Sequence, residues 1–351
     1  MTRFTPILLN WYETYGRTDL PWRNTNDPYM IWVSEIILQQ TRVAQGLNYY
    51  LRFIQEFPTF HDLALAPEDD VLRIWQGLGY YSRARNMHKA AQMIATQGEF
   101  PTNYDDIRKL KGVGDYTAAA ISSFAYNSPY AVVDGNVFRV LSRYFGIETP
   151  IDTTQGKKEF TTLAYKLIDK KNPGKYNSAI MDFGALQCTP KSPKCSNCPL
   201  QDGCYAFNKR ICDELPIRSK KIKLKERYFV YVIIISDGHI FLHKRGGGDI
   251  WQGLYEPLLF EFNKKTGTDA ILNKVKNTIA KKEIMVSSHT EGITHNLTHQ
   301  KLFIDFYEIN VGELHLDLDG FIKVKIEDIA QYGLPQIVHK YLNKIFATFT
   351  L

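Results

Sequence analysis

The sequence predicts two domains of different classes, an all-α half followed by an α+β half. Up to about residue 213 the apolar residues recur with the period of helices, whereas β-branched and aromatic runs typical of strands follow. A basic stretch at 218–227, with six cations in ten residues, separates the two parts. The length of 351 residues suits about two domains. We therefore expect a helical domain over 1–213, a linker over 214–227 and a second domain over 228–351.

Individual elements follow from the periodicity and from the Pro- and Gly-containing turns between them. In the first half we expect helices over 6–15, 29–40, 45–56, 68–75, 82–96, 116–126, 136–145 and 156–169. In the second half we expect strands over 228–236, 240–244, 254–262 and 301–309, and helices over 269–281 and 335–346.

Composition and charge exclude several classes of protein. Forty-three Lys and Arg against 37 Asp and Glu leave a net charge of +6, which permits a polyanionic partner without requiring one. No apolar run reaches the roughly 18 residues of a membrane span, and the N-terminus lacks the apolar stretch of a signal peptide. The five cysteines are crowded between Cys188 and Cys212, which is no disulfide framework for this length. We expect an intracellular, cytoplasmic protein with no membrane segment.

Four cysteines form a candidate metal site with the spacing C-x6-C-x2-C-x5-C. Structural zinc usually takes two close pairs of ligands, and only one close pair is present here. Longer, unequal loops suit a bulkier iron–sulfur cluster, which takes one thiolate for each of four irons. The spacing favours iron–sulfur and leaves zinc as the alternative, while Cys212 is interpreted as an ordinary free cysteine. The candidate ligands are Cys188, Cys195, Cys198 and Cys204.

A glycine-containing turn at 110–117 joins two helical segments. Gly112 and Gly114 would let the backbone approach a phosphate, which the amides at the next helix N-terminus would bind. The alternative is a tight turn that only needs positive φ.

Two carboxylates are candidates for catalysis. Glu35 lies in the apolar stretch 29–40, where burial would raise its pKa toward the value that a general acid needs near neutral pH. The alternative is a Glu at a solvated edge or one paired with a cation. Asp134 directly precedes the helix expected at 136–145, a position typical of a helix N-cap. Together the two residues match the two-carboxylate chemistry of glycoside hydrolysis.

The chain carries several distinctive motifs: LPWR at 20–23, VSEIILQQT at 33–41, GLGYYSRAR at 77–85, the hairpin at 110–117, DGNV at 134–137 and the cysteine quartet. Together these motifs resemble those of the MutY-type adenine DNA glycosylases of the endonuclease III superfamily. The resemblance covers nearly the whole chain and implies an all-α helix-hairpin-helix glycosylase domain with a [4Fe–4S] loop, followed by an α+β Nudix-like domain.

The resemblance implies hydrolysis of the N-glycosidic bond of adenine mispaired with 8-oxoguanine or guanine, in base excision repair of double-stranded DNA. Glu35 would protonate N7 of the flipped adenine, and Asp134 would stabilise the oxocarbenium-like sugar. Tyr116 and Asn136 would support them. Bifunctional relatives carry a Schiff-base Lys where this chain has Tyr116, so we expect a monofunctional glycosylase.

By the same resemblance, Trp22 and Arg23 shape the adenine pocket. Gln40, Leu78 and Tyr80 fill or wedge the stack around the partner base, and the hairpin glycines Gly112 and Gly114 contact the DNA.

The second half resembles the Nudix-like recognition domain of the same family. Thr298 and His299 align with its Phe-Ser-His loop for 8-oxoguanine, although Leu297 replaces the aromatic residue. The Glu-rich, magnesium-binding helix of true Nudix hydrolases is missing, which favours binding over hydrolysis. We expect a nucleoid-associated monomer. The competing hypotheses are a thymine-mismatch or oxidised-pyrimidine glycosylase, a silent mismatch-binding protein and a nucleotide pyrophosphohydrolase.

Overall fold

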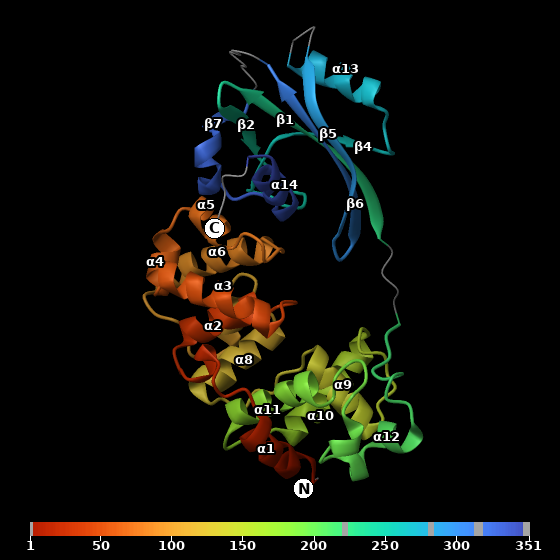
Figure 1. Ribbon diagram of the computed structural model, residues 1–351. Helices are drawn as coiled ribbons and strands as arrows, with labels where there is room; N and C mark the ends of the chain where they lie inside the picture. Colours follow the sequence, from red (N-terminus) through yellow and green to blue (C-terminus); the bar gives the residue numbers. More distant parts are fainter. Residues whose placement is uncertain (1–2, 220–223, 280–283, 312–318, 347–351) are drawn as a thin grey trace. The chain divides into compact units, whose positions relative to one another are not determined.

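The computed structural model describes residues 3–219, 224–279, 284–311 and 319–346. Contacts between backbones divide the chain into two compact units, one of residues 1–65 with 86–221 and the other of 66–85 with 222–351. Figure 1 shows the helices and strands of both units. The sequence did not predict that a short piece of the first half, 66–85, groups with the second.

The first unit is built from helices, and its described residues contain no strand. Helix α6 (Ser82–Gln97) begins in the second unit and continues into the first. The all-α class predicted for this half is confirmed, while α4, α7, α11 and α12 lie outside the helices expected from periodicity. The other helices of this unit are α1 (Phe4–Tyr15), η1 (Pro21–Arg23), α2 (Pro28–Ile37), α3 (Val43–Glu56), α4 (Phe60–Leu65), α7 (Tyr104–Lys109), α8 (Asp115–Tyr126), α9 (Gly135–Phe145), α10 (Thr154–Leu167), α11 (Pro173–Leu186), η2 (Cys195–Asn197), η3 (Gln201–Gly203) and α12 (Tyr205–Lys209).

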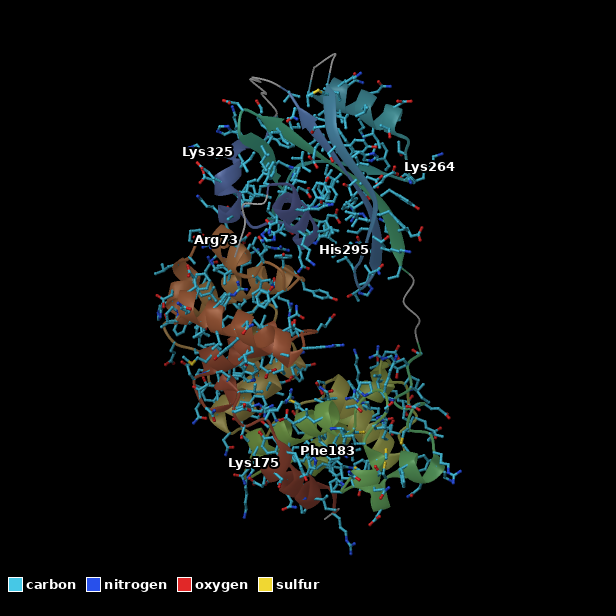
Figure 2. The ribbon with its side chains drawn as sticks, viewed as in Figure 1. Arg73, Lys175, Phe183, Lys264, His295 and Lys325 are labelled. Atoms are coloured by element: carbon cyan, nitrogen blue, oxygen red, sulfur yellow. The ribbon has the colours of Figure 1, made fainter. Side chains whose placement is uncertain are left out.

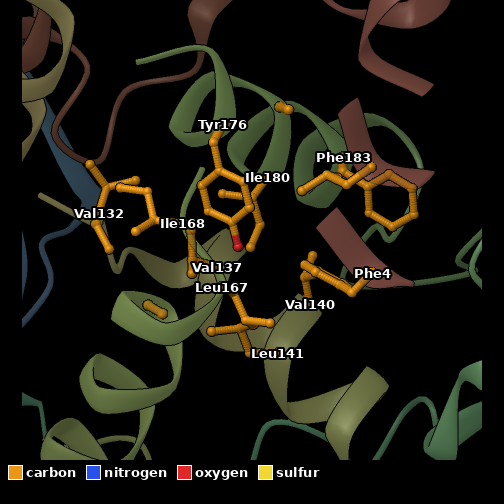
Figure 3. Close-up of a cluster of buried hydrophobic side chains, with 14 of the residues drawn as sticks. Phe4, Val132, Val137, Val140, Leu141, Leu167, Ile168, Tyr176, Ile180 and Phe183 are labelled. Atoms are coloured by element: carbon orange, nitrogen blue, oxygen red, sulfur yellow. The ribbon is translucent and has the colours of Figure 1, made fainter. Parts of the chain in front are cut away.

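The core of the first unit fixes helix α9 against α11. Val137, Val140 and Leu141 recur at helical spacing on α9 and are all buried, and they pack in one cluster with Phe183 of α11 (Figure 3). Gly184 allows the close approach, because a Cβ there would lie only 2.7 Å from the Cβ of Asn136. The N-terminal end of α9, which carries Asp134, is therefore held on a rigid support.

Helix α2 is buried almost all round. Asp27 caps it by accepting a hydrogen bond from the Tyr29 amide, and Pro28 occupies the first turn. The helix packs against α3 and α8 and has no wide polar face. Its two buried polar residues, Ser34 and Glu35, therefore lie in apolar surroundings.

The second unit is a mixed sheet with helices on both faces. The strand order is β3-β2-β1-β6-β5, with β4 also paired to β1 and β7 to β2, and β1 runs parallel to β6. This confirms the α+β class predicted for this half. The strands are β1 (Lys225–Ser236), β2 (His239–Lys244), β3 (Tyr255–Glu256), β4 (Leu258–Phe262), β5 (Met285–Asn296), β6 (Gln300–Asn310) and β7 (Phe321–Lys325). The helices are α5 (Glu68–Ile74), α13 (Thr268–Thr278), η4 (Ile326–Gln331) and α14 (Gln336–Phe346).

Strand β1 is buried on both sides, which explains its continuous apolar run. Phe229, Tyr231 and Ile233 belong to a core shared with α14, and the alternate residues Val230 and Val232 belong to a core shared with α13. Figure 1 shows α13 and α14 on opposite faces of the sheet. Strands β5 and β7 were not predicted; β5 has no fully buried side chain and so carries no alternating signal.

The segment 66–85 is attached to the rest of the second unit by polar contacts. Gln76 Oε1 accepts a hydrogen bond of 2.9 Å from the Leu334 amide, and Arg85 Nη1 donates to the Gln252 carbonyl at 2.6 Å. These contacts join residues more than 150 positions apart, so local periodicity carries no sign of them.

The predicted basic linker is only partly a linker. Residues 220–223 lie outside the described residues, and 225–227 already belong to β1. The buried Arg227 guanidinium donates to Asp249 at 2.7 Å and to Glu261 at 2.6 Å. This cation is therefore committed to ion pairs within the fold and is not part of a free linker. No helix in the described part of the chain has the length and apolar character to cross a membrane.

Candidate active site

The first unit contains a cavity of about 1100 Å³ between α2, α8 and the N-terminal end of α9. Such a volume accommodates a nucleobase together with its sugar. Six of the predicted site residues line it, whereas Trp22, Arg23 and Gly112 do not. Those six are Glu35, Gln40, Gly114, Tyr116, Asp134 and Asn136.

Glu35 is the general-acid candidate of this cavity. It lies on α2 with only 6% of its surface exposed. The pKa of Glu35 is raised from 4.5 to about 7, mainly by burial and also by the nearby Asp134 carboxylate, while a hydrogen bond from Tyr116 and the charge of Arg23 oppose the rise. The carboxyl thus titrates near neutral pH, where a group can both hold a proton and give it up.

Tyr116 stands in the first turn of α8, directly after the hairpin. Burial and the Glu35 and Asp134 carboxylates raise its pKa well above 10, so its phenol stays protonated and can donate to Glu35. The hydroxyl also lies 3.9 Å from Met181 Sδ.

Asp134 is the N-cap of α9, as its position predicts, and it also faces the cavity. Its Oδ1 accepts a hydrogen bond of 2.8 Å from the Val137 amide, and its Oδ2 accepts one of 2.8 Å from Asn136 Nδ2. Burial raises the pKa of Asp134, while these hydrogen bonds favour the carboxylate. Asp134 can therefore cap the helix and present a negative charge to the cavity at the same time.

Two arginines connect α9 to the cysteine segment. Arg139 Nη2 donates to Asn136 Oδ1 at 2.9 Å, and its Nε donates to the Cys188 carbonyl at 2.7 Å. One turn later, Arg143 Nη1 donates to the Thr189 carbonyl at 2.8 Å and lies 3.4 Å from Cys188 Sγ. The cysteine segment and the catalytic end of α9 thus share one hydrogen-bond network.

Sequence reasoning missed a buried carboxylate, Asp182 on α11. It has no exposed surface, accepts a hydrogen bond of 3.1 Å from Arg17 Nε and lies 3.5 Å from Arg23 Nη2. Asp182 therefore orients Arg23, whose charge acts on Glu35 although its side chain does not line the cavity. An acid on the apolar face of a helix, the signal that marked Glu35, would have identified it. Trp22 is buried edge-on against Tyr50.

The two glycines of the hairpin, Gly112 and Gly114, have different surroundings. Gly112 has φ +82° and a Cβ there would lie 2.8 Å from the Cβ of Asn86, so this glycine is required by the turn. Gly114 is the N-cap of α8 and faces open space, so a phosphate could approach its backbone. The exposed Asp115 pairs with Arg108.

Four of the other residues predicted to contact DNA, Leu78, Tyr80, Thr298 and His299, belong to the second unit. Gln40 belongs to the first unit, where it follows α2, is exposed and has φ +58°. Thr298 and His299 are exposed in the turn between β5 and β6. Figure 2 labels His295, which lies on β5 shortly before this turn. The Tyr80 hydroxyl, on a side chain that is 44% exposed, is hydrogen-bonded to the Thr298 hydroxyl. Leu78 is largely buried, and its predicted role as a wedge stays a prediction.

All five cysteines line one cavity, and the donor set fits an iron–sulfur cluster. The thiols lie just after α11, in η2, in the loop after it, at the N-cap of α12 and in the segment after α12. The remaining wall is largely apolar, with Phe183 and Leu200, and the buried Arg143 supplies a positive charge beside Cys188. Thiolates in a shielded site beside a cation suit a negatively charged cluster. Cys212 also lines this cavity, which the sequence interpretation as an unrelated cysteine did not predict.

Comparison with known proteins agrees with this geometry. Three families match: the HhH-GPD superfamily of base excision DNA repair proteins over 33–166, the iron-sulfur binding domain of endonuclease III over 188–204, and the NUDIX domain over 230–344. The adenine DNA glycosylase of Buchnera aphidicola subsp. Baizongia pistaciae is 36% identical over 353 residues, 97% of this chain and 96% of that protein. The chain belongs to the adenine DNA glycosylase family.

Further relatives agree with that membership. The adenine DNA glycosylase of Buchnera aphidicola subsp. Schizaphis graminum is 36% identical over 84% of this chain and 85% of its own. The solved structure of a thermostable thymine-DNA glycosylase is 32% identical and covers 59% of this chain and 95% of its own, with a TM-score of 0.55. The iron–sulfur match spans Cys188 to Cys204 and supports an iron–sulfur cluster over the zinc alternative.

The burial of Glu35 makes a prediction about stability. Because its pKa is about 7 in the folded chain and 4.5 ordinarily, the folded state holds a proton that the unfolded chain releases between these values. Stability therefore falls as pH rises from 4.5 to 7, by about 3 kcal/mol for this group. Glu35→Gln removes the ionisation, so it should raise the stability of the chain at pH 8 and change it little at pH 4.5.

Thermal or denaturant unfolding at the two pH values measures this difference. The matched control is Glu159→Gln, which changes an exposed carboxylate on α10 and should leave the pH dependence unchanged. A Glu35→Gln variant that tracks the unmodified chain at both pH values would contradict the burial assignment.

Proposed function

We propose that this chain is a monofunctional glycosylase that hydrolyses the N-glycosidic bond of adenine mispaired with 8-oxoguanine or guanine in DNA. Family membership supports the removal of adenine in base excision repair. The observation that carries the chemistry is the pair of carboxyls in one cavity, Glu35 with a pKa of about 7 and Asp134 fixed by hydrogen bonds.

The two carboxyls differ in environment, and this difference assigns their roles. The adenine must leave the base stack to reach the cavity, because a stacked base hides its glycosidic bond. Glu35 then transfers its proton to N7 of adenine, so the base can leave with the electron pair of the broken C1′–N9 bond. The Asp134 carboxylate stabilises the positive charge on the sugar until water adds to C1′ and gives its proton to the Glu35 carboxylate.

Neighbouring residues keep this arrangement in place. The Val137 amide and Asn136 hold both oxygens of Asp134, and Arg139 in turn holds the amide of Asn136. Tyr116 donates to Glu35 and limits the rise of its pKa, so the acid remains able to release its proton. The hairpin amide at Gly114, which lines the same cavity, offers a site for a backbone phosphate.

The turn between β5 and β6 is our candidate reader of the partner base. 8-Oxoguanine differs from guanine in its O8 acceptor and its N7–H donor, which a hydroxyl and an imidazole can distinguish. Thr298 and His299 are exposed there, and Leu297 closes the turn by donating its amide to the Gln300 carbonyl at 2.8 Å. Leu297 packs toward the sheet core, and its aliphatic side chain has no aromatic ring for stacking on a base.

The cluster that fits the cysteine site best is [4Fe–4S], bound by Cys188, Cys195, Cys198 and Cys204 with one thiolate for each iron. When bound it would order the segment that Arg139 and Arg143 attach to α9. Its role in this chain would be structural. The protein is proposed to act as a monomer on double-stranded DNA.

A pyrimidine-directed glycosylase is the second candidate, because a thymine-DNA glycosylase shares the fold of part of the chain. That protein is matched over 59% of this chain, whereas adenine DNA glycosylases match up to 97% of it and include the second unit. The longer match favours adenine as the substrate base.

Base release under single-turnover conditions tests the proposal. Duplexes pairing adenine with 8-oxoguanine or guanine should release adenine, and a thymine–guanine duplex should release no base. Glu35→Gln should slow release by about 10²- to 10⁴-fold, the usual contribution of a general acid.

Because the acid acts in its protonated form, the rate should fall about tenfold for each pH unit above 7. Thymine release, or full activity of Glu35→Gln, would contradict the assignment; Glu159→Gln is the control.

The absence of strand cleavage is tested by trapping with borohydride. Tyr116 has no amine for an imine, but Lys157 on α10 also lines the cavity. The unmodified chain and Lys157→Ala should both release adenine without forming a trapped protein–DNA adduct. An adduct that forms as fast as adenine leaves would refute the monofunctional assignment, and its loss in Lys157→Ala would identify the amine.

The partner-base reader is tested by changing Thr298 and His299 together to Ala. Losing one or two hydrogen bonds should reduce the preference for 8-oxoguanine over guanine by roughly tenfold. The comparison is the ratio of adenine release rates on the two duplexes, with Thr294→Ala, an exposed position on β5, as the control. An unchanged ratio would remove this turn from the proposal.

A further inference from the structure

Cys212 lies at one corner of the iron–sulfur site and touches one of its ligands. Its Sγ is 4.0 Å from Cys195 Sγ, and it lines the same cavity as the four cysteines of the family match. That match ends at Cys204, so it assigns no role to Cys212.

Backbone hydrogen bonds hold Cys212 in this place. The Ile211 amide donates to the Ala206 carbonyl at 2.9 Å on one side, and the Glu214 amide donates to the Ile211 carbonyl at 3.1 Å on the other. Arg143 Nε donates to the Leu215 carbonyl at 3.1 Å. The segment that carries Cys212 is therefore tied back to α12 and to α9.

The same arginine also contacts the Cys188 segment of the cysteine cavity. Its Nη1 donates to the Thr189 carbonyl and lies 3.4 Å from Cys188 Sγ, and the residue is only 2% exposed. One buried guanidinium thus sets the Cys188 segment and the Cys212 segment at the same cavity. This arrangement distinguishes Cys212 from a cysteine that merely lies nearby in a loose tail.

We propose that Cys212 is a substitute ligand for the iron that Cys195 binds. An iron of the cluster needs one thiolate, and this corner offers two sulfur atoms in contact. When the Cys195 thiolate leaves the iron, the Cys212 thiol releases its proton to water and its sulfur forms the new iron–sulfur bond. The exchange moves no electron, so it needs no oxidant or reductant. The cluster therefore tolerates the loss of a ligand at this corner.

Iron content of purified variants tests the substitution. The full chain is prepared without oxygen as the unmodified protein, Cys195→Ala, Cys198→Ala, Cys212→Ala and the double variant Cys195→Ala with Cys212→Ala. We expect Cys195→Ala and Cys212→Ala each to keep most of the iron, sulfide and visible absorbance. Cys198→Ala and the double variant should lose most of them, with far-UV circular dichroism as the check that each variant is folded.

Two outcomes would overturn the proposal. Cys195→Ala could lose as much iron as Cys198→Ala, or the double variant could keep as much as Cys195→Ala, which would assign the retained iron to another donor. Alkylation followed by mass spectrometry gives a second readout on the variants that keep iron. Cys212 should react in the unmodified holoprotein and be protected in Cys195→Ala; modification of Cys212 in the iron-loaded Cys195→Ala variant would also overturn it. Neither measurement depends on glycosylase activity.

Discussion

The first unit is organised around one unfavourable event, the burial of the Glu35 carboxyl in an apolar helix. Water would hold this group ionised at neutral pH, and its removal from water raises the pKa to about 7. Helix α2 can supply such surroundings because almost every side chain of the helix is buried. The hydrogen bond from Tyr116 and the charge of Arg23 then return part of the lost stabilisation to the ionised form. The reactivity of the site depends on this balance.

Helix α9 connects the other parts of the site. Its N-cap holds Asp134, its first turn holds Asn136, and Arg139 and Arg143 reach from its body to the cysteine segment. The helix has a strongly apolar face against α11, and Gly184 lets the two helices approach closely. Since rigid elements place side chains more accurately than loops do, the anion of the site is fixed by core packing.

In the second unit, the residues proposed to recognise the partner base lie beside an edge strand with little burial. Strand β5 lies at the edge of the sheet and has no fully buried residue, and the turn after it carries Thr298 and His299. Tyr80 reaches this turn from the segment 66–85, which belongs to this unit although it is encoded within the helical half. Residues that contact a ligand directly must stay exposed, so the core alone does not place them.

The amino-acid sequence by itself determined the two fold classes, the helical positions of Glu35 and Asp134, and the cysteine spacing, because periodicity, capping preference and ligand spacing are local properties. The sequence pattern did not reveal strand β5, because this edge strand lacks the alternation of buried and exposed side chains that marks a half-buried strand. Only the tertiary structure decided the pKa of Glu35, the pairing of Asp182 with Arg17 and Arg23, the commitment of Arg227 to ion pairs, and the contact of Cys212 with Cys195. Each of these depends on desolvation or on groups distant in the chain, and no local pattern records which distant groups will meet.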